Sequence, residues 1–374
     1  MKQKAIIVGG GVIGTMHAWR FLERGFEVLH LERDPEPTMA SVRNFGLVWV
    51  GGRRAGLELE AALQARALWG ELANKAPQLQ FRANGSLTIA RSEQEFRVLQ
   101  QSMELEDAQS RGWELLSPQE ARRINPVLDG DFLGALYCKL DAAVEPGNVL
   151  KSIREFLNES GRYEWRPNTE VVDVTESADS VGVRTASGEI CVSDLVVVCP
   201  GADHTSLFAG EFEAAPLRRV RLQMFSTAPL GVELTTSIAD GDSLRYYPAY
   251  DVPALADLQP QHPVADAAKM QLLMVQRTDG TLTIGDTHEY DEPFDFALRE
   301  PEYEYLIQVA EDILGRRLPK IARRWAGVYS QRTDGAVCDR QFLGKRVVLV
   351  TGPGGRGNTL STAIAENTLS EWGI

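Results

Sequence analysis

The chain has 374 residues, of which 44% are hydrophobic, and it carries a formal net charge of −13 at pH 7. This length exceeds a usual single domain and the apolar content can fill a large core, so we expect two interleaved domains and exclude a small peptide-like scaffold. The acidic balance excludes proteins that follow nucleic acids or anionic membranes by bulk electrostatics, so the expected partners are small molecules.

The four cysteines, Cys138, Cys191, Cys199 and Cys338, lie far apart and form no C-x-x-C pair. No histidine lies at a metal-ligand spacing from them, so we predict neither a metal site nor a disulfide framework. Two lysines near the start precede an apolar run, but no small-residue cleavage site follows, and no stretch is long enough to span a bilayer. We therefore expect a cytoplasmic protein with reduced thiols and no membrane span.

The first predicted elements are typical of a dinucleotide site. Residues 5–8 form a short apolar run suited to a buried parallel strand, and Gly9, Gly11 and Gly14 follow it. These glycines allow a tight turn, a close approach of the backbone to a pyrophosphate, and close packing of the next helix. That helix begins near Val12 and offers its unpaired N–H groups to the phosphates.

Glu32 closes the second apolar run, residues 26–31. It lies roughly 20 residues after the glycines, where an acidic side chain accepts hydrogen bonds from ribose hydroxyls and disfavours a 2′-phosphate. Strand, turn, helix, second strand and terminal acid thus occur in order, which indicates a dinucleotide cofactor and disfavours NADP.

The next segments alternate between loops, helices and short strands. Two prolines predict a loop from residue 33 to about residue 52, and residues 55–73 carry apolar positions at helical spacing. Residues 81–90 alternate around the turn Asn84-Gly85 and predict a hairpin-like pair of strands. Capping boxes at residues 92–95 and 117–120 predict the starts of two further helices.

In the middle of the chain we expect a strand at 134–138, a helix at 146–157, and strands at 170–174 and 181–185. Residues 194–199 form a continuous β-branched run that ends near Gly201, the pattern of a strand buried on both faces in a parallel sheet. We therefore expect this strand to join the sheet formed by the first strands of the chain. Alternating segments then predict a mostly antiparallel second sheet, with strands at 221–226, 243–248 and 272–275.

Near the end of the chain, residues 303–314 predict a helix that Gly315 stops, and residues 346–352 predict one more buried strand. The glycine-rich turn 353–357 leads from it into a helix at 360–372. The expected fold class is α/β with two domains. A Rossmann-like domain, expected to bind the dinucleotide cofactor, collects residues 1–79, 143–214 and 324–374, and a substrate domain with a mostly antiparallel sheet collects residues 80–142 and 215–323.

Over nearly its whole length the chain resembles the glycine oxidase and sarcosine oxidase family of FAD-dependent amine oxidoreductases, often named after D-amino-acid oxidase. The resemblance rests on several motifs, which are the turn ending at Gly14, Glu32, the loop 41–46, the strand before Gly201, and the segments 280–286, 334–335 and 351–357. The second glycine-rich turn favours FAD over NAD, because it offers another backbone surface that can approach a flavin.

The resemblance implies which residues hold FAD. They are Gly9, Gly11, Val12, Ile13, Gly14, Glu32, Arg33, Ser41, Arg43, Asn44, Gly46, Val171, Gly201, Gly354, Gly355, Arg356, Gly357, Asn358 and Thr359. The sarcosine oxidase branch attaches flavin through a cysteine near the segment that matches residues 326–329, which holds none here, so we expect noncovalent FAD. A lysine that assists oxygen reduction in that branch falls near Thr283, where no lysine stands, so the electron acceptor is oxygen or another carrier.

In this family the enzyme positions a neutral amine for hydride loss to the flavin, and water hydrolyses the resulting imine. The glycine oxidase branch has an arginine where Tyr329 stands, so the carboxylate clamp is altered. Tyr247, His288 and Arg245 are our preferred substrate residues together with Tyr329, although His288 can equally be a core histidine. Further candidates for an acidic head are Arg43, Arg53, Arg54, Arg277, Arg332 and Arg356, for each of which a solvated surface charge is the alternative.

The amino-acid sequences of segments 41–46 and 284–290 resemble those of a subgroup of this family that is linked to aminophosphonate breakdown. It suggests an N-substituted 2-aminoethylphosphonate as substrate, since several arginines suit a dianionic head. The alternatives are a glycine, sarcosine or D-amino-acid oxidase or dehydrogenase, and, from another class, a noncatalytic flavin-binding subunit of an electron-transfer complex. An NAD-linked dehydrogenase is weakened by the second glycine turn.

Overall fold

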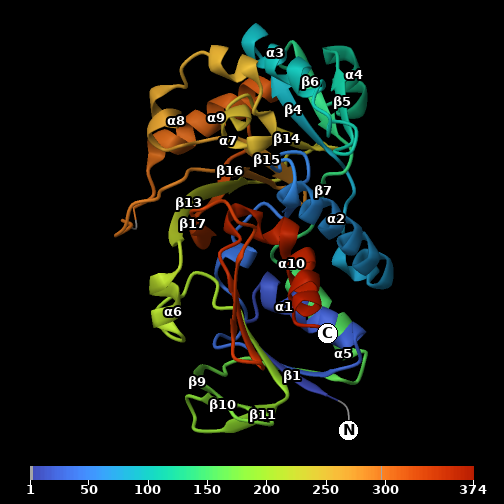
Figure 1. The fold of residues 1–374 in the computed structure, drawn as a ribbon. Helices are drawn as coiled ribbons and strands as arrows, with labels where there is room; N and C mark the ends of the chain where they lie inside the picture. Colours follow the sequence, from blue (N-terminus) through green and yellow to red (C-terminus); the bar gives the residue numbers. More distant parts are fainter. Residues whose placement is uncertain (1–2, 296) are drawn as a thin grey trace.

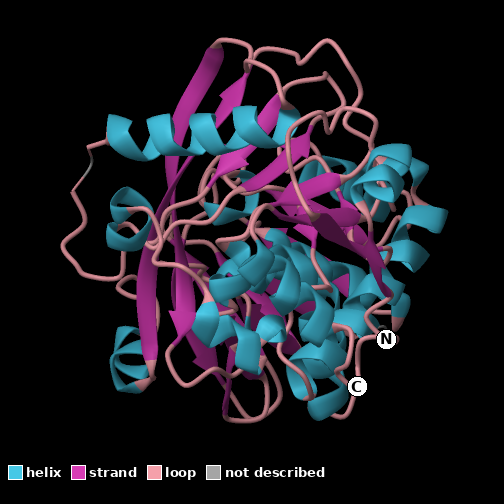
Figure 2. Cartoon of the chain, turned by 90° about the horizontal axis from the view of Figure 1, so that it is seen from above, coloured by secondary structure: helices cyan, strands magenta, loops and turns pink. Residues whose placement is uncertain are grey.

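The computed structural model describes residues 3–295 and 297–374, which form two large sheets flanked by helices. A six-stranded sheet occupies the lower half of Figure 1, and an eight-stranded sheet occupies the upper half. Both termini lie in the half of the molecule that holds the six-stranded sheet (Figure 1), and the two ends are also close in the view from above (Figure 2). Within the described residues, no helix has both the length and the apolar character that crossing a bilayer requires.

The six-stranded sheet is parallel except at one edge. Its order is β18 (Asp339–Leu343), β19 (Val347–Thr351), β12 (Leu195–Val198), β1 (Lys4–Val8), β2 (Glu27–Leu31) and β8 (Tyr163–Arg166). Only β18 runs antiparallel to its neighbour. The central strands are apolar on both faces because both faces are covered, and Ile7 and Val197 are each fully buried. This sheet collects strands from the start, the middle and the end of the chain.

Helices cover one face of this sheet, and a small sheet covers the other. Helix α1 (Val12–Glu23) packs against α5 (Val149–Asn158) and α10 (Gly357–Glu371), and α10 also contacts α2 (Leu57–Lys75). On the opposite face lie β9 (Val171–Glu176), β10 (Val181–Thr185) and β11 (Ile190–Ser193), an antiparallel sheet whose valines share a core with Ile6. A short helix, α6 (Ala209–Ala214), follows β12.

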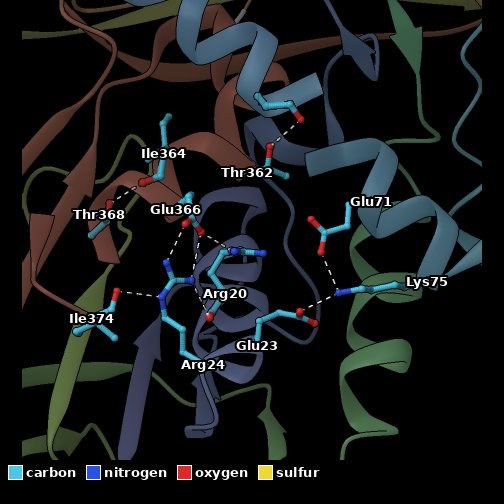
Figure 3. Close-up of polar contacts among 11 residues, drawn as sticks. Arg20, Glu23, Arg24, Glu71, Lys75, Thr362, Ile364, Glu366, Thr368 and Ile374 are labelled. Atoms are coloured by element: carbon cyan, nitrogen blue, oxygen red, sulfur yellow. Dashed lines mark hydrogen bonds and ion pairs between the residues drawn. The ribbon is translucent and has the colours of Figure 1, made fainter. Parts of the chain in front are cut away.

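Ion pairs tie these helices together across the sequence (Figure 3). Arg20 and Arg24 on α1 both reach Glu366 on α10, with N–O distances of 2.6 Å and 2.8 Å. Lys75 at the end of α2 reaches Glu23 of α1 at 2.8 Å (Figure 3). These contacts join residues near the N-terminus to residues near the C-terminus, so they help to assemble a domain whose pieces are far apart in the chain.

The eight-stranded sheet is antiparallel except where β14 pairs with β4. Its order is β17 (Ile321–Arg332), β13 (Leu217–Thr227), β16 (Leu282–Gly285), β15 (Leu273–Gln276), β14 (Ser237–Ala239), β4 (Ser86–Ala90), β6 (Gly134–Cys138) and β5 (Trp113–Leu116). Helices α3 (Glu93–Ser102), α4 (Pro118–Ile124), α8 (Pro263–Ala267) and α9 (Glu300–Leu314) lie above it in Figure 1. A two-stranded pair, β3 (Leu47–Val48) with β7 (Ala142–Ala143), completes the strands of the described residues.

The predicted fold class is confirmed, because a mostly parallel sheet and a mostly antiparallel sheet both occur. We keep the predicted division into two domains as a proposal. All strands of the six-stranded sheet fall within residues 1–79, 143–214 and 324–374. The proposal needs one adjustment, since β17 begins at Ile321 and belongs to the other sheet, so the last boundary cuts that strand.

Two local predictions were wrong. Residues 243–248 do not form a strand, because Ser243–Tyr246 make one helical turn, α7, and Pro248–Tyr250 make a 3-10 turn. Residues 81–90 do not pair with each other, because β4 is an interior strand between β14 and β6, and Arg82 bridges Ala143 instead. In contrast, both capping boxes are confirmed at Ser92 and Ser117, where side chain and backbone bond reciprocally.

Candidate active site

The first glycine turn leaves no room for side chains. Gly9 follows β1 with a φ of 106°, and a Cβ added there would lie 2.3 Å from the carbonyl oxygen of Cys199. A Cβ on Gly14 would lie 2.0 Å from the carbonyl oxygen of Gly9. Helix α1 then begins at Val12 without a side-chain bond from its N-cap residue, Gly11. The turn therefore lets a ligand approach the backbone at the start of α1 closely, as a pyrophosphate requires.

Two acceptor side chains frame this turn. Glu32 accepts a hydrogen bond from the N–H of Gly10 at 2.6 Å and another from Asp34 at 3.0 Å. The hydroxyl of Ser41 accepts from the N–H of Val12 at 2.9 Å. The acid at the end of β2 and the 41–46 loop thus both meet the start of α1, which places them where ribose and phosphate groups of a dinucleotide would bind.

The sequence did not reveal a buried histidine beneath the turn. His30 on β2 is fully buried, and its Nε2 lies 2.9 Å from the carbonyl oxygen of Gly9 while its Nδ1 lies 2.9 Å from the hydroxyl of Tyr163. Because a carbonyl oxygen only accepts, Nε2 carries the proton and the Tyr163 hydroxyl donates to Nδ1. Burial lowers the pKa of His30 to about 3, so a neutral imidazole holds the turn in place. The alternation of β2 could have indicated the burial of His30 but not its partner.

A second turn approaches the same space from the other end of the chain. Gly352 and Gly354 have φ values of 70° and 64°, and α10 begins at Gly357, three residues earlier than the sequence predicted. This helix also lacks a side-chain cap. A Cβ added to Gly355 would lie 3.6 Å from the hydroxyl oxygen of Tyr329 and 3.8 Å from that of Tyr246. The second turn therefore faces the tyrosine-rich wall formed by the other sheet.

One cavity of about 820 Å³ joins the two turns. Its volume is in the range of cofactor sites. Of the residues that the resemblance assigned to the cofactor, the following line it: Gly9, Gly11, Val12, Ile13, Gly14, Glu32, Arg33, Ser41, Arg43, Asn44, Val171, Gly201, Gly354, Gly355, Gly357 and Asn358. Glycines that exclude side chains, beside two helix starts that receive no side-chain bond from their N-cap residues, are what a dinucleotide cofactor needs, so the cavity fits such a group.

Three residues assigned to the cofactor lie outside the cavity wall. Gly46 has a φ of 68°, and a Cβ there would meet the carbonyl oxygen of Val144 at 2.1 Å. The guanidinium of Arg356 donates to Glu58 at 2.9 Å. The Thr359 hydroxyl accepts from the N–H of Trp49 at 2.9 Å. These three residues contact neighbouring protein groups instead of lining the cavity.

The opposite wall of the cavity comes from the eight-stranded sheet. Tyr329 on β17, Met224 on β13 and Asp286 directly after β16 line it. The Tyr329 hydroxyl is buried and has no hydrogen-bond partner among the described residues. Burial raises the pKa values of Tyr329 and Asp286, so the tyrosine is neutral and the acid is a stronger base than usual. Asp286 was not among the predicted substrate residues.

Two of the predicted substrate residues lie behind this wall, and a third lies elsewhere. Tyr247 and His288 are 8% and 3% exposed, and both rings contact Tyr246, at centroid distances of 5.1 Å and 4.4 Å. Neither lines the cavity. Arg245 lies on α7 rather than on a strand, with its guanidinium bonded to the carbonyl of Gln259 and 3.9 Å from Asp242. The structure therefore brings together Tyr247, His288 and Tyr329, but not Arg245.

The candidate arginines differ in what they contact. Arg43 lines the cavity and donates to the carbonyl oxygens of Thr38 and Ala326, at 2.7 Å and 3.0 Å. Arg53 is buried beside Glu58 at 3.7 Å, and Arg277 is buried and donates to Thr283 and to the backbone of the 41–46 loop. Arg332 pairs with Asp334 and Asp339, and Arg54 lies on the surface. Only Arg43 of this set faces the cavity.

Arg219 and Arg221 of β13, which the sequence did not single out, also line the cavity. Arg221 pairs with Glu289 at 2.5 Å, and Arg219 pairs with Glu292. Both acids follow β16, so the cationic edge of the site is built by one strand and the loop beside it. In the described part of the chain, no three histidine, cysteine or acidic side chains are grouped as metal ligands.

Comparison with known proteins assigns the fold and the family. Residues 4–371 match the profile of the DAO family, described as FAD dependent oxidoreductase. The glycine oxidase of Bacillus cereus superposes with a TM-score of 0.79 at 21% identity, covering 100% of this chain and 95% of that one. The L-proline dehydrogenase of P. horikoshii superposes with a TM-score of 0.78 at 19% identity, covering 98% of this chain and 92% of that one.

Among curated proteins, an opine oxidase subunit from Rhizobium meliloti is 26% identical over 238 residues. The match covers 59% of this chain and 62% of the relative, so less than two thirds of the relative's length is spanned. D-amino acid dehydrogenase of Helicobacter pylori is 20% identical over 257 residues, 55% of this chain and 61% of the relative. The names of these two relatives describe different reactions, the oxidation of opines and the dehydrogenation of D-amino acids.

Proposed function

Because the chain belongs to the family of FAD-dependent oxidoreductases, we propose that it oxidises a C–N bond of a small amine that carries an acidic head group. FAD is the cofactor of the family, and when bound it supplies the acceptor for two electrons and a hydrogen. The observation that carries the proposal is the single cavity that joins both glycine turns to Asp286 and Tyr329. A buried acid and a cofactor cradle in one cavity suit an amine substrate.

The protein's own part is to orient the amine and to exclude water. Met224 and Tyr329 form an apolar and aromatic wall opposite the second glycine turn. Such a wall strengthens polar contacts made inside the cavity and holds the reacting carbon near the cofactor. The imine that results from loss of the hydride is hydrolysed by water, so no protein nucleophile is needed.

We assign recognition of the acidic head to Arg43. Its guanidinium contacts only carbonyl oxygens, and no acidic side chain of the described residues pairs with it. It therefore keeps a full positive charge for a ligand, whereas Arg219 and Arg221 are already paired with acids on the neighbouring loop. A carboxylate or phosphonate gains from a fork-shaped donor of this kind.

The substrate that we favour is an N-substituted 2-aminoethylphosphonate or a related aminophosphonate. Arg43 lines the cavity without an acidic partner among the described residues, and a phosphonate offers its guanidinium more oxygen acceptors than a carboxylate does. The test is an anaerobic titration of the purified holoenzyme with glycine, sarcosine, D-alanine, 2-aminoethylphosphonate and N-methyl-2-aminoethylphosphonate, following the loss of flavin absorbance. We expect the phosphonates to reduce the flavin fastest, and faster reduction by sarcosine or glycine would redirect the proposal to an amino-acid oxidase or dehydrogenase.

A second candidate function is that of a flavin-binding component of a larger complex. The match to the opine oxidase subunit favours it, since that relative is named as one subunit of an oxidase. Such a component would contain FAD that no amine of the panel reduces. Reoxidation of the reduced flavin by air, followed by stopped flow, further separates an oxidase from a dehydrogenase that uses another carrier.

We also propose that FAD is held noncovalently and that the protein is cytoplasmic. All four cysteines are free thiols, which suits a reducing compartment. Cys199 lines the cavity, but burial raises the pKa of its thiol, so the nucleophilic thiolate is scarce. Precipitation with trichloroacetic acid should leave a colourless pellet and a yellow supernatant, and a yellow pellet would disprove noncovalent binding.

A further inference from the structure

Asp286 is a buried acid on the cavity wall whose hydrogen bonding is incomplete. Its side chain is buried, and the residue lines the cavity directly after β16. Its Oδ1 accepts one long hydrogen bond from the Nε2 of Gln271, at 3.5 Å, and its Oδ2 lies 3.8 Å from the Nε2 of His288. A carboxylate can accept about four hydrogen bonds. Asp286 therefore has acceptor capacity that its protein neighbours do not fill.

Two other buried aspartates show what a structural role looks like in this chain. Asp141 accepts hydrogen bonds from the N–H groups of Val50 and Gly51, at 2.5 Å and 3.0 Å, and from a serine hydroxyl at 2.6 Å. Asp240 accepts from the N–H of Leu272 at 3.1 Å and from the N–H and hydroxyl of a serine. Both acids fix backbone, and neither lines the cavity. Asp286 has the burial of these residues without their partners.

The neighbouring histidine, His288, does not supply the hydrogen bond that Asp286 lacks when its imidazole is neutral. The Nδ1 of His288 lies 2.9 Å from the carbonyl oxygen of Lys269, which only accepts, so Nδ1 carries a proton. In a neutral imidazole, the lone pair of Nε2 then faces the oxygen of Asp286 across 3.8 Å. The Nε2 of His288 and the Oδ2 of Asp286 would then both be acceptors, so a donor must come from a proton between them or from another group. An N–H group of a ligand in the cavity would supply it.

The surroundings of Asp286 favour a cation. The titratable groups that face it are His288, Tyr246, Tyr247, Tyr290 and Tyr329. Four of these five groups are tyrosines, and burial raises their pKa values, so they are neutral and add no negative charge that would compete for the ligand. Two arginines stack on these tyrosine rings, with Arg53 5.9 Å from the centre of the Tyr247 ring and Arg218 4.0 Å from the centre of the Tyr290 ring.

We propose that Asp286 is the residue that binds and deprotonates the amine nitrogen of the substrate. Its carboxylate accepts a hydrogen bond from the substrate ammonium and then takes one proton. The N–H bond breaks, the O–H bond forms, and the electron pair stays on nitrogen, so no electrons are exchanged in this step. The lone pair released on nitrogen is what the later loss of hydride from the neighbouring carbon requires. The inference rests on the proposed amine oxidation and assigns that site its base.

Burial supports this role because it raises the pKa of the Asp286 carboxyl, an increase that only a protonated His288 would oppose. A carboxylate with a raised pKa is a better proton acceptor than an exposed one.

The test compares the pH dependence of flavin reduction in the wild-type holoenzyme and in Asp286→Asn, by anaerobic stopped flow with sarcosine and N-methyl-2-aminoethylphosphonate as probes. Removal of a general base typically costs about 10²- to 10⁴-fold in rate. We expect a loss of that size for Asp286→Asn at pH 7, and a reduction rate that rises about tenfold per pH unit because only the neutral amine then reacts. The wild type should show a nearly flat profile over the same range.

The matched control is Asp242→Asn, which removes a partly buried acid that bonds Tyr305 outside the cavity, and which should keep the wild-type profile. If Asp286→Asn matches the wild type in rate and profile, Asp286 is not the base. If Asp286→Asn fails to bind FAD, Asp286→Glu decides: a flat profile supports the role, and a rate that climbs with pH overturns it. A wild-type flavin that neither amine reduces would instead disprove the proposed function.

Discussion

Replacement of His17 by methionine should change how stability depends on pH. His17 lies on α1, is fully buried, and donates from Nδ1 to the carbonyl oxygen of Ile13 at 2.8 Å, while its Nε2 has no partner among the described residues. Burial lowers its pKa from 6.5 to about 4. Methionine has a similar volume and no titrating group, so His17→Met tests the cost of charging this imidazole inside the core.

The magnitude follows from the two pKa values of His17, 6.5 in the unfolded chain and about 4 in the folded protein. Because the folded value is the lower one, the unfolded chain binds more protons between them. The wild type therefore loses stability as the pH falls through this window. Linkage gives a loss of about 2 kcal/mol at pH 5 and about 3 kcal/mol at pH 4, relative to pH 8, from this residue. His17→Met should not show this loss.

The assay is urea unfolding with saturating FAD at pH 5, 6, 7 and 8, followed by circular dichroism. The wild type should lose about 2 kcal/mol more than His17→Met between pH 8 and pH 5, whatever the constant offset between them. All other titrating groups cancel in this difference. Met16→Leu, a buried and nontitrating change on the same helix, should run parallel to the wild type. Parallel curves for His17→Met and wild type would show that His17 has the same pKa in the folded and the unfolded protein, which would refute the reasoning.

Two further predictions concern cofactor affinity and domain assembly. Gly14→Ala should weaken FAD binding by about 10- to 100-fold, roughly 1–3 kcal/mol of overpacking, because the added Cβ would lie 2.0 Å from the carbonyl oxygen of Gly9. Gly147→Ala, whose Cβ meets nothing within 4 Å, is the control in a fluorescence titration of apoprotein with FAD, and equal affinities would contradict the steric argument. Glu366→Gln should lower the free energy of unfolding by about 1–3 kcal/mol at pH 7, because two charge-assisted partners lose their acid. Since the pKa of Glu366 is lowered in the folded protein, this difference should shrink in acid, and a difference that grew as the pH fell would contradict it.

The sequence predicted the parts of the site that depend on backbone geometry. A glycine is needed at positions 9 and 14 because other backbone atoms occupy the space of a Cβ, and such positions leave a visible pattern. Buried parallel strands such as β12 were equally visible, because a strand covered on both faces is apolar at every position. These features are encoded locally, so the two turns and the central sheet could be located before any tertiary contact was known.

Local pattern failed where tertiary contacts decide. Residues 243–248 alternate polar and apolar side chains, but Gly241 and Asp242 precede them and Pro248 ends them. Ser243–Tyr246 therefore make one helical turn instead of a strand. The same error placed Arg245 on the substrate wall, because a strand would have directed alternate side chains to one face. In the helical turn, Tyr246 and Tyr247 pack toward the core and Arg245 stays at the surface. The turn residues on both sides were the available signal.

The substrate side of the cavity was hardest to predict because its chemistry depends on burial rather than on residue type. Asp141, Asp240 and Asp286 are three aspartates of nearly equal burial, and nothing in their neighbouring residues separates them. Asp141 and Asp240 are surrounded by N–H and hydroxyl donors, so their carboxylates are occupied by hydrogen bonds that fix the backbone. Asp286 meets one distant amide and one imidazole, so its charge is free to act on a ligand. Asp286 is therefore distinguished by the hydrogen-bond donors that it lacks, and these can be identified only from the three-dimensional structure.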